Sequence, residues 1–145
     1  MEHHLILRVI TKILIAPILI FAFYVQFHGD YSPGGGFQAG IIFAVGFILY
    51  ALVFGLRPTK KVLPEWVVHK FMALGVLIFA GTGVAGLMMG GNYLNYSVLA
   101  EIPQKGQHLG LLLIEFGVGT TVAAVMISIF YAFAGRPPRI SDEDW

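Results

Sequence analysis

Cysteine is absent from the 145 residues of the chain, and charged residues are scarce. The absence of cysteine excludes both a disulfide framework and a thiolate metal site. Only 12% of the residues are charged and 57% are hydrophobic, whereas an ordinary soluble domain has roughly 25% charged residues. So little charge cannot cover the surface of a soluble domain, and the composition is typical of a protein whose outer surface faces lipid.

The motifs of several enzyme classes are also missing. The sequence has no HExxH or paired-cysteine metal motif and no phosphate-binding GxxxxGK motif. The run from Pro33 to Gly36 lacks the Lys and Ser/Thr that phosphate binding uses, and no nucleophile lies beside a base in a recognisable arrangement. We therefore expect a protein that is not an enzyme and that uses no cofactor or metal.

Four long apolar runs are present, at about residues 5–27, 37–56, 67–90 and 108–134. Each has the roughly 20 residues that an α-helix needs to cross about 30 Å of hydrocarbon. Helices are expected because four segments cannot close a barrel and open strand edges cannot face lipid. No small-residue cleavage pattern follows the first run, so we expect it to be retained. The predicted fold is one all-α domain of four transmembrane helices, arranged as helical hairpins, with a tail at 135–145.

Lys and Arg residues are distributed unevenly between the two sides of these helices. Eight Lys and Arg residues lie in the N-terminal flank, in the second loop with the start of the next helix, and in the tail: Arg8, Lys12, Arg57, Lys60, Lys61, Lys70, Arg136 and Arg139. The first loop has none, and the third has only Lys105. Because cytoplasmic flanks are enriched in Lys and Arg, this bias predicts that both termini are cytoplasmic and that the glycine-rich first loop is external.

The first loop has the sequence HGDYSPGGGFQAG at residues 28–40. Three successive glycines after a proline allow positive φ angles and leave no side chain between the backbone and a neighbour. One interpretation is an ordinary hairpin connection between two helices. The other is that the start of the second helix, with free backbone N–H groups near Gly36 and Phe37, lies against a partner backbone or a polar path. The length of the loop does not separate these interpretations.

Glu115 is the only carboxylate inside any of the four runs. An ionised carboxylate near the bilayer centre costs about 3 kcal/mol on insertion scales, so such residues usually face a protein interior or a water-filled cavity. His108 lies seven residues earlier, on the same helix face and roughly 10 Å away. We predict an ion path that includes Glu115, His108, Thr120 and Thr121. The alternative is a protonated Glu115 that is hydrogen-bonded to a neighbouring helix, which burial favours.

Small residues recur on the last two predicted helices. Thr82, Gly86 and Gly90 repeat every four residues on the third, and Gly117 and Gly119 lie close together on the fourth. Small side chains allow membrane helices to approach closely, so we interpret both sets as packing positions.

The segment from Phe27 to Gly40, with its histidine, its PGGGF run and its glutamine at the helix start, resembles the B subunit of the Mrp-type (Mnh) multisubunit sodium/proton antiporters. The resemblance covers essentially the whole chain, since that family also has four helices, this size and a short hydrophilic tail. It implies an accessory subunit of a hetero-oligomeric complex in the plasma membrane of a prokaryote, whose largest subunits are similar to the proton-pumping membrane subunits of respiratory complex I. Such complexes exchange cytoplasmic sodium for external protons, and the B subunit alone is not expected to transport.

For the site, the resemblance implies that the loop motif lies at a contact with another subunit near the external side, through His28, Pro33, Gly34, Gly35, Gly36 and Phe37. The expected partners are the other membrane subunits, the lipid bilayer and the transported sodium ions and protons, with no nucleic acid. An alternative is a purely structural subunit of the same complex or of a related complex I-like assembly, such as a membrane-bound hydrogenase. Glu115 and His108 lie outside the motif, so their predicted role rests on their position in the membrane.

Overall fold

A computed structural model describes residues 2–29 and 34–136 of the chain. Its elements are the α-helices α1 (Glu2–Phe27), α2 (Gly36–Phe54), α3 (Leu56–Val62), α4 (Glu65–Met88) and α5 (Pro103–Ala134), with the short 3-10 helix η1 (Tyr96–Leu99) before α5. The four helices α1, α2, α4 and α5 are long and apolar enough to cross a membrane. The predicted class, an all-α membrane protein with four spanning helices, is confirmed.

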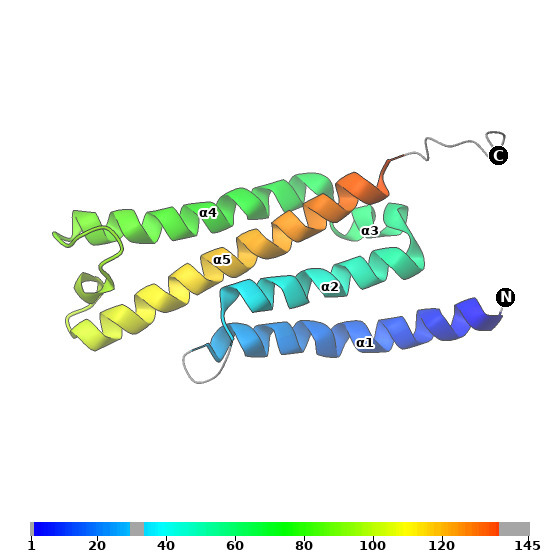
Figure 1. Cartoon of the computed structure of the whole chain (residues 1–145), viewed down its shortest axis with the longest axis horizontal. Helices are drawn as coiled ribbons and strands as arrows, with labels where there is room; N and C mark the ends of the chain where they lie inside the picture. The colour runs from blue at the N-terminus through cyan, green and yellow to red at the C-terminus, as the bar shows by residue number, and fades with distance from the viewer. Residues whose placement is uncertain (1, 30–33, 137–145) are drawn as a thin grey trace.

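The four long helices lie side by side in one layer, in the order α1, α2, α5 and α4 (Figure 1). α1 packs against α2, α2 packs against α5, and α5 packs against α4. α1 and α4 therefore form the two edges of the layer. Both broad faces of the layer remain open to lipid or to other proteins.

Little of each spanning helix is buried within the chain. The buried share of the most apolar stretch is 11% in α1, 22% in α4, and 28% in both α2 and α5. Large apolar side chains such as Leu5, Ile20, Leu52, Leu77 and Phe133 are about two-thirds exposed. The buried positions are largely glycine and alanine, so the helices are held together mainly by close backbone approach. A small core cluster that includes Val68, Ile127 and Tyr131 also packs α4 against α5.

Glycine and proline determine where several helices begin and end. Gly55, with φ of +93°, follows Phe54 and ends α2, two residues before the predicted end. The seven-residue α3 follows at once and was not predicted. α5 begins at Pro103, five residues before the predicted start, because proline suits the first turn of a helix, where no partner for its missing N–H is needed.

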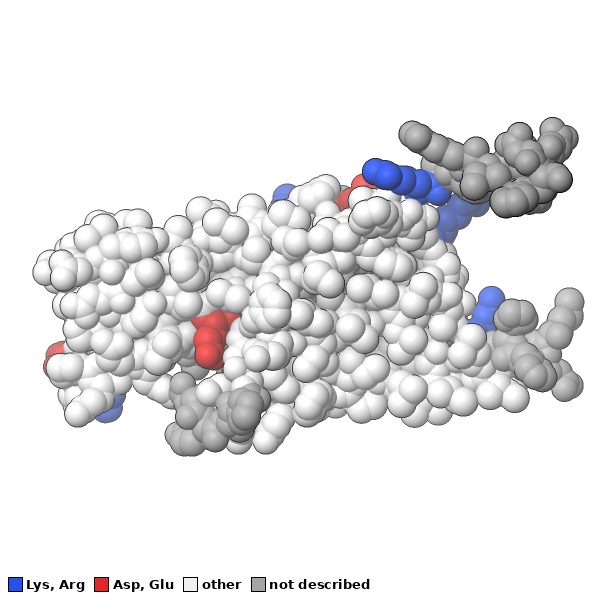
Figure 2. Space-filling model, viewed as in Figure 1, with Lys and Arg blue, Asp and Glu red and all other residues white. Residues whose placement is uncertain are grey.

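The start of α1, the end of α5 and the short helix α3 lie at one end of the layer, opposite the loops that follow α1 and α4 (Figure 1). Most Lys and Arg side chains gather at the same end, as Figure 2 shows. Here Arg8 and Lys12 lie over the ring of Phe54, at 5.9 and 5.6 Å from its centroid, and Lys60 pairs with Glu65 at 2.5 Å. We call this end of the layer the basic end and the opposite end the loop end. The cytoplasmic location of the basic end stays a prediction.

Candidate functional site

The side chain of Glu115 on α5 lies against both ends of the first loop. A Cβ atom built on Gly29 would lie 2.9 Å from Oε1 and 3.0 Å from Oε2 of Glu115, and one built on Gly35 would lie 3.3 Å from Oε1. The carboxylate fits between these two residues because neither carries a side chain. The loop and the intramembrane carboxylate, which the sequence presents as two separate features, therefore form one site.

The start of α2 lies directly on the backbone of α5. A Cβ atom on Gly36 would overlap the carbonyl oxygen of Glu115 and lie 3.0 Å from the backbone nitrogen of Gly119. One turn later, a Cβ atom on Gly40 would lie 2.6 Å from the carbonyl oxygen of Gly119. Gly36 and Gly40 thus let α2 and α5 approach closely at the level of Glu115.

The N-terminus of α2 gives the carboxylate a favourable electrostatic position. The first backbone N–H groups of a helix have no partner within the helix, and together they carry a partial positive charge. Gly35 is the residue that precedes α2, and Glu115 Oε1 lies beside it. The second interpretation of the loop expects the start of the helix to lie against a partner backbone or a polar path. In this structure it lies against Glu115 of the same chain, whose side chain is half-buried, and the interpretation stays a prediction.

The site is recessed relative to the α4–α5 pair. α5 extends from Glu115 back to Pro103, which is twelve further residues or about 18 Å of helix. Figure 1 shows α4 and α5 reaching further at the loop end than α1 and α2 do. Residues 109–114 are apolar. The first loop and Glu115 therefore lie closer to the middle of the layer than the start of α5 does, and an apolar stretch of α5 lies between the two levels.

The other predicted ion-path residues lie in three different surroundings. His108 is exposed on the second turn of α5, two helical turns from Glu115. The Thr120 hydroxyl donates a hydrogen bond to the Phe116 carbonyl oxygen at 2.8 Å, and Thr121 donates to Gly117 at 2.9 Å. Thr121 also lies against α4, at the Cβ position of Gly75. His108, Glu115 and the two threonines thus lie at three successive levels along α5.

The residues of the loop motif point in different directions. The ring of His28 stacks on Tyr24 with 4.6 Å between centroids, and a Cβ atom on Gly34 would lie 3.1 Å from the carbonyl oxygen of Val25. Gly35 and Gly36 are buried against α5 of the same chain. Phe37 is 58% exposed, so within the described motif it is the side chain best placed to contact another subunit. Pro33 lies outside the described residues.

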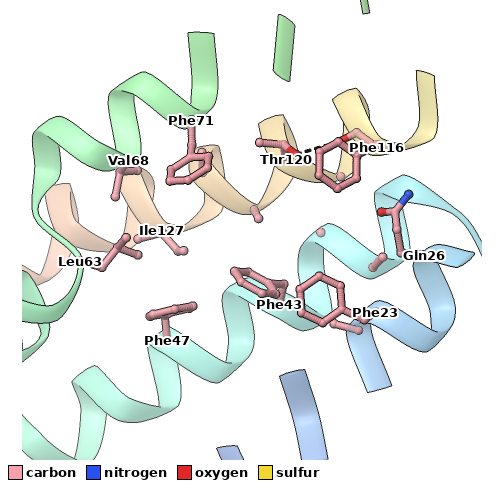
Figure 3. A pocket seen from close by; sticks show the side chains of 16 residues that line it. Phe23, Gln26, Phe43, Phe47, Leu63, Val68, Phe71, Phe116, Thr120 and Ile127 are labelled. Atoms are coloured by element: carbon pink, nitrogen blue, oxygen red, sulfur yellow. Dashed lines mark hydrogen bonds between the residues drawn. The ribbon is translucent and has the colours of Figure 1, made fainter. Parts of the chain in front are cut away.

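An apolar groove with a cavity volume of about 340 Å³ opens beside this site, lined by residues of α1, α2, α4 and α5 (Figure 3). Its walls include five phenylalanines: Phe23, Phe43, Phe47, Phe71 and Phe116. Gln26 and Thr120 contribute the polar side chains of its lining. The lining of the groove is therefore almost entirely apolar.

Two glutamines near Glu115 were not predicted to belong to the site. Gln26, in the last turn of α1, is only 9% exposed, and its Oε1 lies against Gly119. Gln38, in the first turn of α2, has its Oε1 3.8 Å from the position of a Cβ atom on Gly35. An amide in the last turn of an apolar helix is the signal that could have identified Gln26. Among the residues that the structure describes, no group of three His, Asp or Glu side chains could hold a metal ion.

Four long apolar helices in an open layer define a multi-pass membrane protein. Residues 6–128 match the family described as "Domain related to MnhB subunit of Na+/H+ antiporter". The chain belongs to this MnhB family, and the resemblance inferred from the loop motif is confirmed.

Two relatives support this assignment over nearly their whole length. The chain is 36% identical over 137 residues to a protein of Staphylococcus haemolyticus (strain JCSC1435) named "Putative antiporter subunit mnhB2", covering 92% of this chain and 96% of the relative. A protein of the same name from Staphylococcus aureus (strain Newman) is 32% identical with the same coverage. The similarity therefore includes all four spanning helices.

Proposed function

We propose that this chain is an accessory membrane subunit of a multisubunit Na+/H+ antiporter, and that the junction of Glu115 with the first loop lines part of the ion path. The family description and the names of the relatives support the first part. The observation that carries the second part is the position of the Glu115 carboxylate between Gly29 and Gly35. A carboxylate at this depth is costly unless it faces polar surroundings or takes part in transport.

The open layer supports a role within an assembly. A transporter that works alone usually binds its ion between two packed halves, whereas here the edges and both faces of one layer are open. The exposed apolar side chains are suited to contact with lipid and with other membrane subunits. We infer that these other subunits of the antiporter complete the walls of the path in the plasma membrane.

The charge distribution supports an orientation for this path. With the basic end in the cytoplasm, as the positive-inside rule predicts, Glu115 lies toward the external side, because it contacts the first loop at the opposite end of the layer. External protons then reach the carboxylate from the side of His108, which is exposed. The Glu115 carboxylate binds either a proton or a sodium ion, but not both at once. Antiport through a shared site requires the two ions to compete in this way.

A purely structural role is the alternative, in the same complex or in a related complex I-like assembly such as a membrane-bound hydrogenase. The observation that favours it is the contact of Gly36 and Gly40 with the backbone of α5. In this case Glu115 only fixes the loop at the start of α2. The two functions differ in whether the charge of Glu115 matters after the complex has assembled.

Glu115→Gln separates these functions because it keeps the size and one acceptor oxygen of the side chain and removes its charge. In everted membrane vesicles that contain the assembled complex, we expect sodium-dependent antiport to fall about tenfold or more, which corresponds to about 1.4 kcal/mol at the limiting step. Glu101→Gln, at an exposed glutamate of the third loop, is the matched control and should leave antiport unchanged. Normal antiport by an assembled Glu115→Gln complex would refute the ion-path role and support the structural one.

A further inference from the structure

The apolar groove between the four long helices lies open on the surface of the layer (Figure 3). Three of the phenylalanines in its walls, Phe23, Phe71 and Phe116, are between 42 and 50% exposed. Because the four helices form a single layer, these rings face the surroundings of the chain and not a closed core. Within a membrane, such a surface is suited to an apolar occupant that comes from outside the chain.

The dimensions of the groove match one fatty acyl chain. The groove runs from Leu63 and Val68 to Gln26 and Phe116 (Figure 3). Its lining on α5 extends from Phe116 to Ile127, which is about 16 Å of helix and close to one leaflet, or half of about 30 Å of hydrocarbon. The cavity volume of about 340 Å³ holds about eleven methylene-sized groups at about 30 Å³ each. A transmembrane helix is about 10–12 Å wide and is too thick for this volume.

The short helix α3 places positive charge beside one end of the groove. Leu63, which follows α3, lines the groove, and its carbonyl oxygen accepts a hydrogen bond from the Tyr131 hydroxyl at 2.9 Å. On α3 itself, Arg57 and Lys61 are exposed and four residues apart, so they lie on one face of the helix. Neither pairs with a carboxylate in the part of the chain that the structure describes. A phosphate group at this end of the layer would therefore meet two cations.

We propose that the groove binds one acyl chain of an anionic phospholipid from the leaflet at the basic end, and that Arg57 and Lys61 bind its phosphate. Basic side chains at the membrane surface attract anionic headgroups, while the walls of the groove offer the acyl chain apolar contacts along its length. The bound chain fills the space that α2 and α5 leave open between them. This site is separate from the ion path at Glu115, and neither proposal depends on the other.

A photoreactive ring in the wall of the groove identifies its occupant. Phe71→benzoylphenylalanine is placed in the purified complex, which is washed in mild detergent to remove loosely held lipid. After irradiation, we expect mass spectrometry to show this subunit with the added mass of one phospholipid. Leu77→benzoylphenylalanine, on the same helix but outside the groove and 67% exposed, is the matched control and should give several-fold less lipid adduct.

Three results of this experiment would overturn the proposal. A cross-link from position 71 to another subunit would show that a protein partner occupies the groove. Equal lipid adducts at positions 71 and 77 would show ordinary bilayer contact, and no lipid adduct at position 71 would show that no lipid is bound. If the Phe71 variant does not assemble, Phe23 on the α1 wall takes the photoreactive ring and the same criteria apply.

Filling the groove should expel the acyl chain. Thr120 lines the groove, and its hydroxyl bonds to the Phe116 carbonyl of its own helix, so Thr120→Phe adds a ring without breaking that kind of bond between helices. We expect the lipid adduct at position 71 to fall several-fold in Thr120→Phe. Ile129→Phe, at an exposed position of α5 outside the groove, should keep it. An undiminished adduct in the assembled Thr120→Phe complex would contradict a chain bound in the groove.

The headgroup is tested in vesicles of equal parts phosphatidylglycerol and phosphatidylcholine, because the mass of the adduct at position 71 identifies the lipid. We expect the anionic lipid to exceed its share in the vesicle several-fold. The double variant Arg57→Gln/Lys61→Gln should lose this preference and keep an adduct, while Lys105→Gln, at an exposed lysine of the third loop, should keep both. The same lipid ratio in the double variant and the wild type would overturn the assignment of the phosphate to Arg57 and Lys61.

Discussion

Gly35 satisfies two requirements that no other residue meets at once. Its φ of +129° and ψ of −179° lie in a region that is essentially restricted to glycine. Its missing side chain also leaves room for Glu115, because a Cβ atom would lie 3.3 Å from Oε1. The successive glycines of the loop motif therefore shape the turn and admit the carboxylate of α5.

Gly35→Ala should reduce transport more than a substitution that causes backbone strain alone. Strain at such a position costs roughly 1–3 kcal/mol, and the added methyl group also displaces the Glu115 carboxylate. Gly90→Ala is the matched control, since Gly90 has φ of +82° and nothing within 4 Å of its Cβ position. We expect antiport per assembled complex to fall several-fold in Gly35→Ala and to stay near the wild-type rate in Gly90→Ala. Equal rates in the two variants would contradict the contact with Glu115.

The sequence predicts the members of this site but not their contact. Glu115 stands out as a carboxylate in an apolar run, and the loop stands out through its turn chemistry, because both signals are local. Their meeting depends on α2 packing against α5, which no local pattern encodes. Gln26 was missed because one amide near the end of a helix is equally typical of a membrane boundary.

At the scale of elements, α4 and α5 approach closely at Gly75, which was not predicted as a packing position, and at Gly117, which was. A Cβ atom on Gly75 would overlap the Thr121 hydroxyl and lie 2.6 Å from the carbonyl oxygen of Gly117. Gly86 instead accommodates the loop after α4, since its Cβ position lies 3.2 Å from the carbonyl oxygen of Asn95. The loop folds back between the outer halves of the two helices, so small residues there make room for the loop and not for a helix.

Gly75→Ala should weaken this helix pair. The methyl group meets the backbone of α5, which cannot move aside as a flexible side chain can, and overpacking of this kind typically costs about 1–3 kcal/mol. We expect less chain in the assembled complex, measured by quantitative blotting after purification through a partner subunit. Gly81→Ala on the same helix has nothing within 4 Å of its Cβ position and should assemble normally. If both variants assemble equally well, close packing at Gly75 is not needed.

At the scale of the whole molecule, hydropathy predicts four spanning helices but cannot predict that they form a row. Helix order is readable from sequence when each helix has one apolar face. Here the spanning helices are apolar on all sides, so a closed bundle and an open layer look the same in the sequence. The short α3 was missed for a related reason, because its seven residues are too few for a periodic signal. We propose that the open layer reflects assembly, in which other subunits cover the surface that this chain leaves exposed.

The orientation of the layer can be tested directly because the chain has no cysteine. Val62→Cys places one thiol at the exposed end of α3, and Glu101→Cys places one in the exposed third loop. Both substitutions keep every Lys and Arg, so the charge bias that sets orientation is unchanged. On intact cells, a membrane-impermeant maleimide should label Glu101→Cys and not Val62→Cys, and everted vesicles should reverse the result.

The labelling result decides which side of the membrane supplies the ion at Glu115. If Val62→Cys reacts on intact cells, the basic end is external and Glu115 lies toward the cytoplasm. External protons would then have to pass the aromatic groove before they reach the carboxylate. If Glu101→Cys reacts, His108 and Glu115 face the external medium in that order along α5, and the recessed loop marks where an ion leaves water and enters the assembly.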